Sequence, residues 1–168
     1  MMNYQLTVRL SKTFIALSIG LFCFIVGLDN ILDFNTNYQF VIHVLSMDTF
    51  QPWFDGKAIE WRAITGESAH IFFYWVIIMF ELTAGIICLI ASVIMLKHIK
   101  NEKFKNGKAL FIIGATVGIA VWYLGMAVIA SEWFAMWANK MTSQQSAYNI
   151  SLIILISMCY MSTNERAD

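Results

Sequence analysis

Long runs of apolar residues constrain this chain more than any other feature. A helix needs roughly 20 apolar residues to cross the hydrocarbon core of a bilayer, which is about 30 Å thick. Four runs approach or exceed this length, at residues 13–32, 71–96, 109–131 and 147–161. We therefore predict an all-α membrane protein, a bundle of four transmembrane helices in which residues 1–168 form a single integral membrane domain.

The composition excludes several other classes of protein. Hydrophobic residues make up 59% of the chain and charged residues 13%, whereas soluble domains are roughly 45–50% apolar and about 25% charged. Such a chain is neither soluble nor disordered. Eleven basic residues balance 11 acidic ones, so we expect no nucleic-acid partner. The expected partner is the lipid bilayer.

The basic residues divide unequally between the two sides of the predicted bundle. The larger group of eight comprises Arg9, Lys12, Arg166 and the five lysines of the loop 97–108, and the smaller group of three comprises Lys57, Arg62 and Lys140. Cytoplasmic loops of membrane proteins carry an excess of Lys and Arg. We therefore predict that both termini and the basic loop 97–108 are cytoplasmic, and that residues 33–70 form an outward segment.

The outward segment is too long to be a plain connection, because structureless loops of this length are uncommon in compact proteins. Apolar residues at Val41, Val44 and Leu45 give the stretch from Tyr38 to Asp48 one apolar face, which is typical of a short amphipathic helix at the membrane interface. Aromatic residues that suit the same interface follow at Trp53, Phe54 and Trp61. We predict an aromatic-rich cap built on a short amphipathic helix.

Glu81 is the most unusual residue of the predicted spans. It lies ten residues into the second span, about 15 Å deep at 1.5 Å per residue, and therefore near the midplane. A charge at this depth is costly, and such residues are functional candidates by default. Three interpretations stay open: a protonated hydrogen-bond partner that joins helices, a proton or ligand site, and a lipid-facing position. Asp29 and Glu132, near the outward ends of their spans, are further polar candidates.

Helical phase places polar and small residues on two stripes. At 100° per residue, one stripe of the second span comprises His70, Tyr74, Glu81, Gly85, Cys88 and Ser92, and one stripe of the third span comprises Gly114, Gly118, Gly125 and Glu132. Small residues let membrane helices approach closely. We predict that both stripes face the bundle interior, that the three glycines pack against other helices, and that Glu132 points inward.

No metal or cofactor site is predicted. The chain contains no HxxxH, HExxH or CxxC spacing. His70 and Glu81 are about 16 Å apart along one helix and could not share an ion. We likewise find no catalytic motif and expect that the protein is not an enzyme.

Four motifs give a resemblance to a known family. They are Tyr38–Thr49, Glu60–Thr65, Phe73–Trp75 with Glu81, and Glu132–Trp137. Together these motifs resemble a bacterial family of predicted small integral membrane proteins, classed as a domain of unknown function. The resemblance implies a four-span protein of the bacterial inner membrane, while the fourth span and the tail Asn164–Arg166 match little. It also singles out these positions: Asn30, His43, Asp48, Trp61, Arg62, His70, Glu81, Glu132, Trp133 and Trp137.

These features leave three hypotheses of function. The first is a non-enzymatic accessory or interaction subunit of a membrane assembly, which would contact other membrane subunits or itself. The second is a small transporter or proton-coupled carrier that uses Glu81. The third is an outward-facing site for a small molecule or a metal, lined by His43, His70 and the tryptophans.

Overall fold

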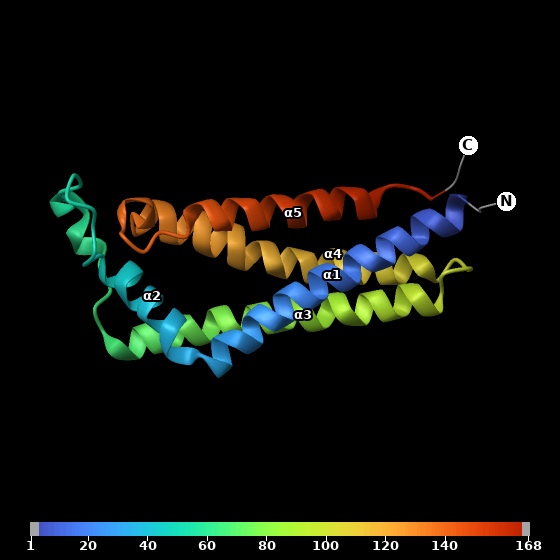
Figure 1. Cartoon of the computed structure of the whole chain (residues 1–168), viewed down its shortest axis with the longest axis horizontal. Helices are drawn as coiled ribbons and strands as arrows, with labels where there is room; N and C mark the ends of the chain where they lie inside the picture. Colours follow the sequence, from blue (N-terminus) through green and yellow to red (C-terminus); the bar gives the residue numbers. More distant parts are fainter. Residues whose placement is uncertain (1–3, 166–168) are drawn as a thin grey trace.

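The protein is a bundle of long helices with a small cap at one end (Figure 1). A computed structural model describes residues 4–165, and within these residues the only β-structure is an isolated bridge between Phe50 and Asn139. The elements in chain order are α1 (Tyr4–Leu32), α2 (Phe34–Ser46), the 3₁₀ helix η1 (Lys57–Arg62), α3 (Glu67–Lys97), α4 (Phe104–Ile119), the π-helix η2 (Ala120–Trp133), the 3₁₀ helix η3 (Met136–Ala138) and α5 (Gln144–Ser162). The all-α membrane fold that the sequence predicts is confirmed.

Three helical stretches are long and apolar enough to cross a bilayer. They are Tyr4–Leu32, Glu67–Lys97 and the continuous stretch Phe104–Trp133, which joins α4 to η2. The predicted fourth span forms α5, a helix of 19 residues that packs beside α4 and η2. Its first turns carry Gln144, Gln145 and Asn149, which make it less apolar than the other three. That α5 crosses the membrane stays a prediction.

The bundle is held together by close contacts of α3 with α1 and α4. A Cβ atom added at Gly85 of α3 would lie 2.5 Å from the backbone nitrogen of Phe24 on α1. A Cβ added at Gly114 of α4 would lie 2.7 Å from the Sγ atom of Cys88 on α3, and one at Gly118 would lie 3.3 Å from Ile154 of α5. Gly114 and Gly118 therefore allow the close helix packing that their spacing predicts.

The phase of the third span changes at Ala120, where the α-helix becomes a π-helix. The wider i→i+5 pattern is visible at its end, where the Phe134 amide donates to the Ile129 carbonyl at 3.2 Å. Residues after Ala120 consequently lie on other faces of the helix than a period of 3.6 residues predicts. The predictions for Gly125 and Glu132 are wrong for this reason: a Cβ at Gly125 would meet no other helix within 4 Å, and Glu132 is exposed.

The cap is formed by residues 33–66, and we call the end of the bundle that it covers the cap end. The predicted amphipathic helix is present as α2, which buries Val41, Val44 and Leu45. Asn139, which is 1% exposed, ties the cap to the bundle. Its Oδ1 atom accepts a hydrogen bond of 2.7 Å from the Thr49 hydroxyl, and its Nδ2 atom donates to the His43 carbonyl at 3.2 Å.

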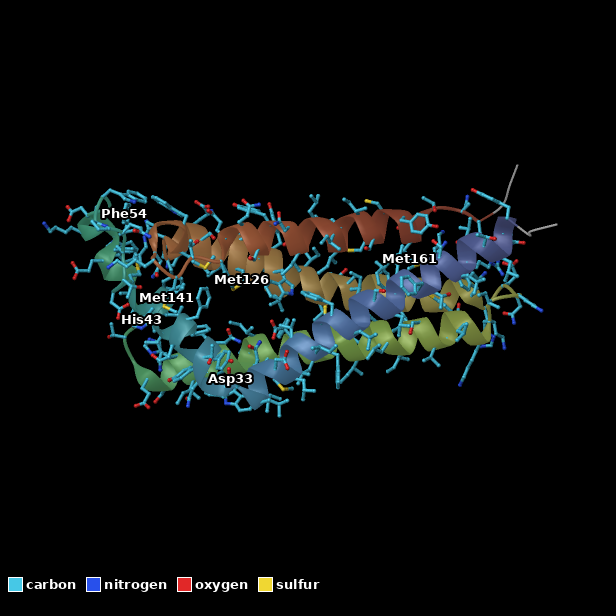
Figure 2. All side chains as sticks on the ribbon, viewed as in Figure 1. Asp33, His43, Phe54, Met126, Met141 and Met161 are labelled. Atoms are coloured by element: carbon cyan, nitrogen blue, oxygen red, sulfur yellow. The ribbon has the colours of Figure 1, made fainter. Side chains whose placement is uncertain are left out.

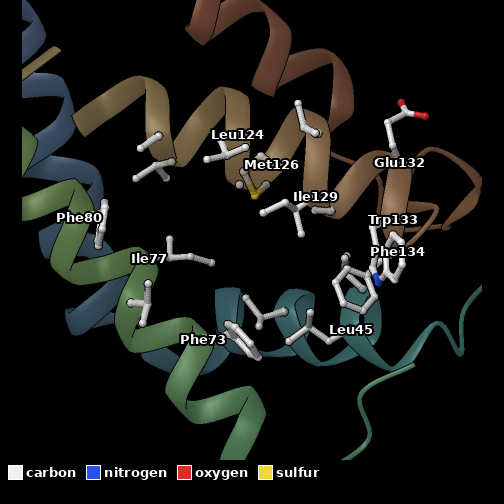
Figure 3. A pocket seen from close by; sticks show the side chains of 18 of the residues that line it. Leu45, Phe73, Ile77, Phe80, Leu124, Met126, Ile129, Glu132, Trp133 and Phe134 are labelled. Carbon is white, nitrogen blue, oxygen red and sulfur yellow. The ribbon is translucent and has the colours of Figure 1, made fainter. Parts of the chain in front are cut away.

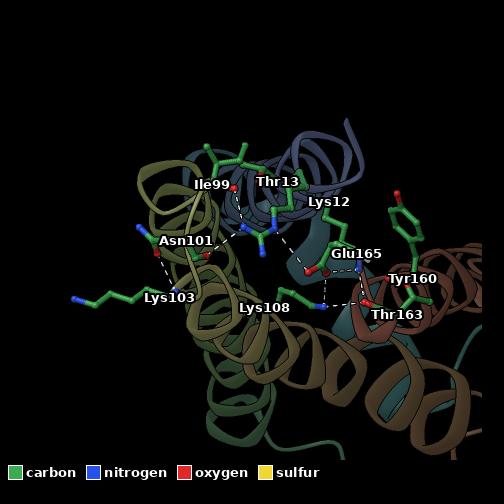
Figure 4. Close-up of polar contacts among 10 residues, drawn as sticks. Lys12, Thr13, Ile99, Asn101, Lys103, Lys108, Tyr160, Thr163 and Glu165 are labelled. Atoms are coloured by element: carbon green, nitrogen blue, oxygen red, sulfur yellow. Dashed lines mark hydrogen bonds and ion pairs between the residues drawn. The ribbon is translucent and has the colours of Figure 1, made fainter. Parts of the chain in front are cut away.

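The opposite end carries the α3–α4 loop, the start of α1 and the segment after α5, and we call it the basic end (Figure 4). Here the Glu165 carboxylate lies 2.7 Å from the Lys12 amine, 2.6 Å from the Lys108 amine and 3.8 Å from the Arg9 guanidinium. Burial raises the pKa of Glu165, but the hydrogen bonds and charges of Lys108 and Lys12 outweigh it and lower the pKa overall. Arg166, which belongs to the basic group of the sequence, lies outside the described residues.

Candidate functional site

The polar stripe of α3 faces the bundle interior, as its periodicity predicts. His70, Tyr74, Glu81, Cys88 and Ser92 are all buried. Glu81 is 3% exposed, and its Oε2 atom accepts a hydrogen bond of 2.7 Å from the Asn30 amide of α1. Its other oxygen, Oε1, has no hydrogen-bond partner within residues 4–165. The carboxyl group is therefore held from one side only.

Asn30 organises a small network around this carboxyl. The Asn37 amide of α2 donates to Asn30 Oδ1 at 2.6 Å, and the Tyr74 hydroxyl donates to the Asn30 backbone carbonyl at 3.1 Å. Asn37 can reach Asn30 because α1 ends at Leu32 and α2 begins two residues later at Phe34. Since α1, α2 and α3 all contribute polar groups, the network fixes the position of the Glu81 carboxyl.

Glu81 lines a cavity of about 490 Å³, which we call the Glu81 cavity. Figure 2 labels two of its wall residues, Met126 of η2 and Met141 of the segment before α5. The hydrogen-bonding side chains of the wall are Asn30, Thr36, Asn37, Tyr74, Glu81, Trp122, Thr142, Ser143 and Ser146. Several of them, including Thr36, Asn37 and Ser146, are exposed at the cap end. The cavity therefore joins a carboxyl inside the bundle to the surface at the cap end.

Toward the basic end, the bundle beside Glu81 is tightly packed. Ala84 and Cys88 of α3 are 0% exposed and Cys23 of α1 is 1% exposed. Gly85, one turn beyond Glu81, brings α3 against the backbone of α1 at Phe24. These contacts separate the Glu81 cavity from the basic end.

A second, apolar cavity of about 800 Å³ lies between α2, α3 and η2, and we call it the apolar groove (Figure 3). Its walls include Phe73 and Phe80 of α3 and Leu124 and Ile129 of η2. Five residues line both cavities and form the partition between them: Phe40, Val41, Ile77, Val121 and Met126.

The histidines singled out by the sequence serve the cap and lie outside the Glu81 cavity. His43 forms a 2.9 Å pair with Asp48 at the surface. The His70 Nε2 atom lies 2.6 Å from the Ile64 carbonyl and 3.4 Å from the Ser46 hydroxyl, so His70 joins α3 to the cap. His43 and His70 therefore do not line an outward site together, as the third hypothesis of the sequence expects.

The aromatic and charged candidates gather at the cap end. Trp61 and Trp133 meet edge to face with ring centroids 5.8 Å apart, and Trp137 stacks on Trp53 at 5.9 Å. The Arg62 Nη1 atom donates to the Trp133 carbonyl at 3.3 Å. Arg62 forms no ion pair with Asp29, Asp48 or Glu132.

Two of the polar candidates take no part in the Glu81 network. Asp29 is exposed, although the neighbouring Asn30 is buried in the network. Glu132 is also exposed and lines the apolar groove. Within residues 4–165, no group of three or more His, Cys, Asp and Glu side chains lies close enough to hold a metal ion.

Sequence reasoning missed one wall of the cavity. Thr142 and Ser143, just before α5, and Ser146, in its first turn, form this wall. Asn37 was also missed, since its role depends on the turn between α1 and α2. A cluster of short polar residues just before the fourth apolar run was the only available signal for this wall.

One family model matches residues 8–164 of the chain, and its description is predicted small integral membrane protein (DUF2165). The chain belongs to this family. Membership agrees with the resemblance carried by the sequence motifs, and it identifies the protein as a small integral membrane protein. The match includes α5 and Asn164, so the expectation that the fourth span matches little is wrong. No curated protein and no solved structure matches the chain.

Proposed function

We propose that this DUF2165 protein binds a small polar molecule in the Glu81 cavity, on the side of the membrane that the cap faces. The observation that carries the proposal is the unpartnered Oε1 atom of a carboxyl that lines a cavity inside the bundle. Ionisable residues at such depth are costly, and they mark ligand or ion sites in membrane proteins. A carboxyl oxygen accepts hydrogen bonds, which favours a ligand with an N–H or O–H donor, such as an amine.

The packing beyond Glu81 supports binding over transport. A carrier needs a path that opens to both sides of the membrane in turn. The contacts of Gly85 with Phe24, and the buried Cys23 and Cys88, fill the bundle between Glu81 and the basic end. The proposal therefore takes up the third hypothesis of the sequence and replaces the histidines by the Glu81 network.

The test is the recovery of a small molecule from protein isolated in native membrane discs. Mass spectrometry of the released contents is compared for the parent, Glu81→Gln and Ser146→Trp, with Tyr148→Phe as a control because Tyr148 lies on α5 outside the cavity lining. We expect one molecule to be enriched with the parent and the control and lost from the other two. Equal enrichment in all four proteins, or none in the parent, would contradict the proposal.

An accessory role is the second candidate function, and the exposed aromatic residues of the cap favour it. Trp53 is 66% exposed and Trp61 is 71% exposed, and interface cores are enriched in aromatic residues. The non-enzymatic role, the inner-membrane location and the contact with other subunits belong to this candidate. Gentle detergent extraction followed by native sizing tests it, and a mass that always equals one chain would count against it.

A further inference from the structure

The apolar groove is open along its length, between two helices that are long and apolar enough to span a membrane. Val76 and Phe80 of α3 are 37% and 45% exposed, and Leu124 and Ile129 of η2 are 52% and 46% exposed. These four residues line the groove. In a bilayer such a surface meets acyl chains, because both helices lie at the depth of the hydrocarbon core.

A cation lies at the cap end of this groove. The Cζ atom of the Arg62 guanidinium lies 4.6 Å from the centroid of the Trp133 ring, and Trp133 lines the groove. Arg62 Nη1 also donates to the Trp133 carbonyl. Arg62 is thus held at the groove by two contacts with Trp133, one with its ring and one with its backbone.

In the described part of the chain, no acidic side chain neutralises the charge of Arg62. Within residues 4–165, no carboxylate lies within 4.0 Å of its nitrogen atoms, and its buried Nε atom has no hydrogen-bond partner. Glu132, the acidic residue of the groove lining, points its carboxylate away from the groove (Figure 3). A guanidinium carries five N–H donors, and within residues 4–165 the one hydrogen bond of the Arg62 guanidinium is that of Nη1 to Trp133, so the Nη atoms keep donors for an external acceptor.

We propose that the apolar groove and Arg62 form a binding site for one glycerophospholipid of the cap-side leaflet. An acyl chain occupies the groove, and the phosphodiester accepts hydrogen bonds from the guanidinium. Arginine suits this role because its planar donors match phosphate oxygens. Trp61 and Trp133 lie together at the cap end of the bundle, and tryptophan rings are enriched where spans meet the headgroups. The site shares only its partition with the Glu81 cavity, so it stands independently of the proposed function.

The experiment is native mass spectrometry of the full chain, delipidated in detergent and mixed with phosphatidylglycerol or with a diacylglycerol of the same acyl chains. We expect the parent to retain phosphatidylglycerol and to retain diacylglycerol weakly. Arg62→Gln removes the charge and should weaken phosphatidylglycerol binding about tenfold or more, as expected for loss of charge-assisted hydrogen bonds. Lys57→Gln is the matched control, since Lys57 is an exposed cation of the same cap that pairs with Asp55, and it should bind like the parent.

A second variant tests the groove itself. Gly125 lines the groove, and the nearest atom to an added Cβ would be the Ala120 carbonyl oxygen at 3.4 Å, so Gly125→Phe can fill the groove. We expect it to lose phosphatidylglycerol while unfolding at the temperature of the parent. If Arg62→Gln does not fold, Gly125→Phe alone tests whether the groove binds the lipid. Equal retention of the two lipids by the parent, unchanged binding by a folded Arg62→Gln, or unchanged binding by Gly125→Phe would overturn the proposal.

Discussion

The Asn30 amide donates a 2.7 Å hydrogen bond to the Glu81 carboxyl and so joins α1 to α3 inside the bundle. Both residues are buried, at 6% and 3% exposure. The bond explains how a carboxyl group is accommodated at this depth, because a buried polar group is tolerated when it is hydrogen-bonded. A substitution at either residue should therefore lower the free energy of unfolding only when the new side chain cannot form this hydrogen bond.

Glu81→Gln keeps the shape and the hydrogen-bonding capacity of the neutral acid, and we expect it to unfold at the temperature of the parent. Glu81→Leu leaves the Asn30 amide without its acceptor and should cost about 1–3 kcal/mol. Thermal unfolding in detergent measures both. The double variant Asn30→Leu with Glu81→Leu is the control and should recover part of the loss, because neither partner is then left unpaired. Equal stability of all variants would show that the bond has no structural role.

Gly85→Ala should destabilise the bundle by about 1–3 kcal/mol, the usual cost of overpacking. The added methyl group would lie 2.5 Å from a backbone nitrogen of α1, which cannot move without shifting the helix. Gly66→Ala is the matched control, because a Cβ there meets nothing within 4 Å and its φ of −77° suits any residue. If both variants lowered the unfolding temperature by the same amount, the close packing of α3 against α1 would be contradicted.

Asn139→Leu should loosen the cap from the bundle. The side chain accepts from Thr49, donates to the His43 carbonyl and is fully enclosed, so its loss leaves buried groups unpaired at about 1–3 kcal/mol. Limited proteolysis after Lys57 measures the opening of the cap, and we expect faster cleavage than in the parent. Asn149→Leu, a change at an exposed asparagine of α5, should leave the cleavage rate unchanged.

The ion-pair cluster of the basic end should weaken in acid. The pKa of Glu165 is lower in the folded protein than the ordinary value of 4.5. Its contribution to stability is therefore complete above that value, and it is lost as the pH falls through the lowered pKa. Glu165→Gln should remove this part of the acid dependence of the unfolding temperature. Glu102→Gln, at an exposed acidic residue of the same end, should retain it.

Topology is tested by cysteine labelling in intact cells. The background variant carries Cys159→Ser, since Cys159 is exposed while Cys23 and Cys88 are buried. With both termini in the cytoplasm, a cysteine at Asp55 should react with a membrane-impermeant maleimide, and one at Lys105 should react only after lysis. Labelling at Lys105 in intact cells would reverse the predicted orientation.

The features that depend on local pattern can be predicted from the amino-acid sequence alone. The apolar runs predict the helices, and the period of polar and small residues predicts the buried face of α3. Val41, Val44 and Leu45 predict the buried face of α2. On α3 the polar and small residues turn to the bundle interior because polar groups are costly against lipid. On α2 the apolar face is buried against the bundle, as in any amphipathic helix. The same reasoning identified Glu81 as the unusual residue of the spans.

The groups that meet across the bundle could not be predicted from local pattern. The partner of Glu81 is Asn30, 51 residues away, and the cavity beside it is lined by residues of α2, η2 and the start of α5. The predicted facing of the third span is wrong after Ala120, because the π-helix changes the number of residues per turn. Gly125 and Glu132 therefore do not lie on the same face as Gly114 and Gly118. Contacts between distant helices depend on their crossing points, and these are set by packing of the whole bundle, as at Gly85, where α3 touches the backbone of α1.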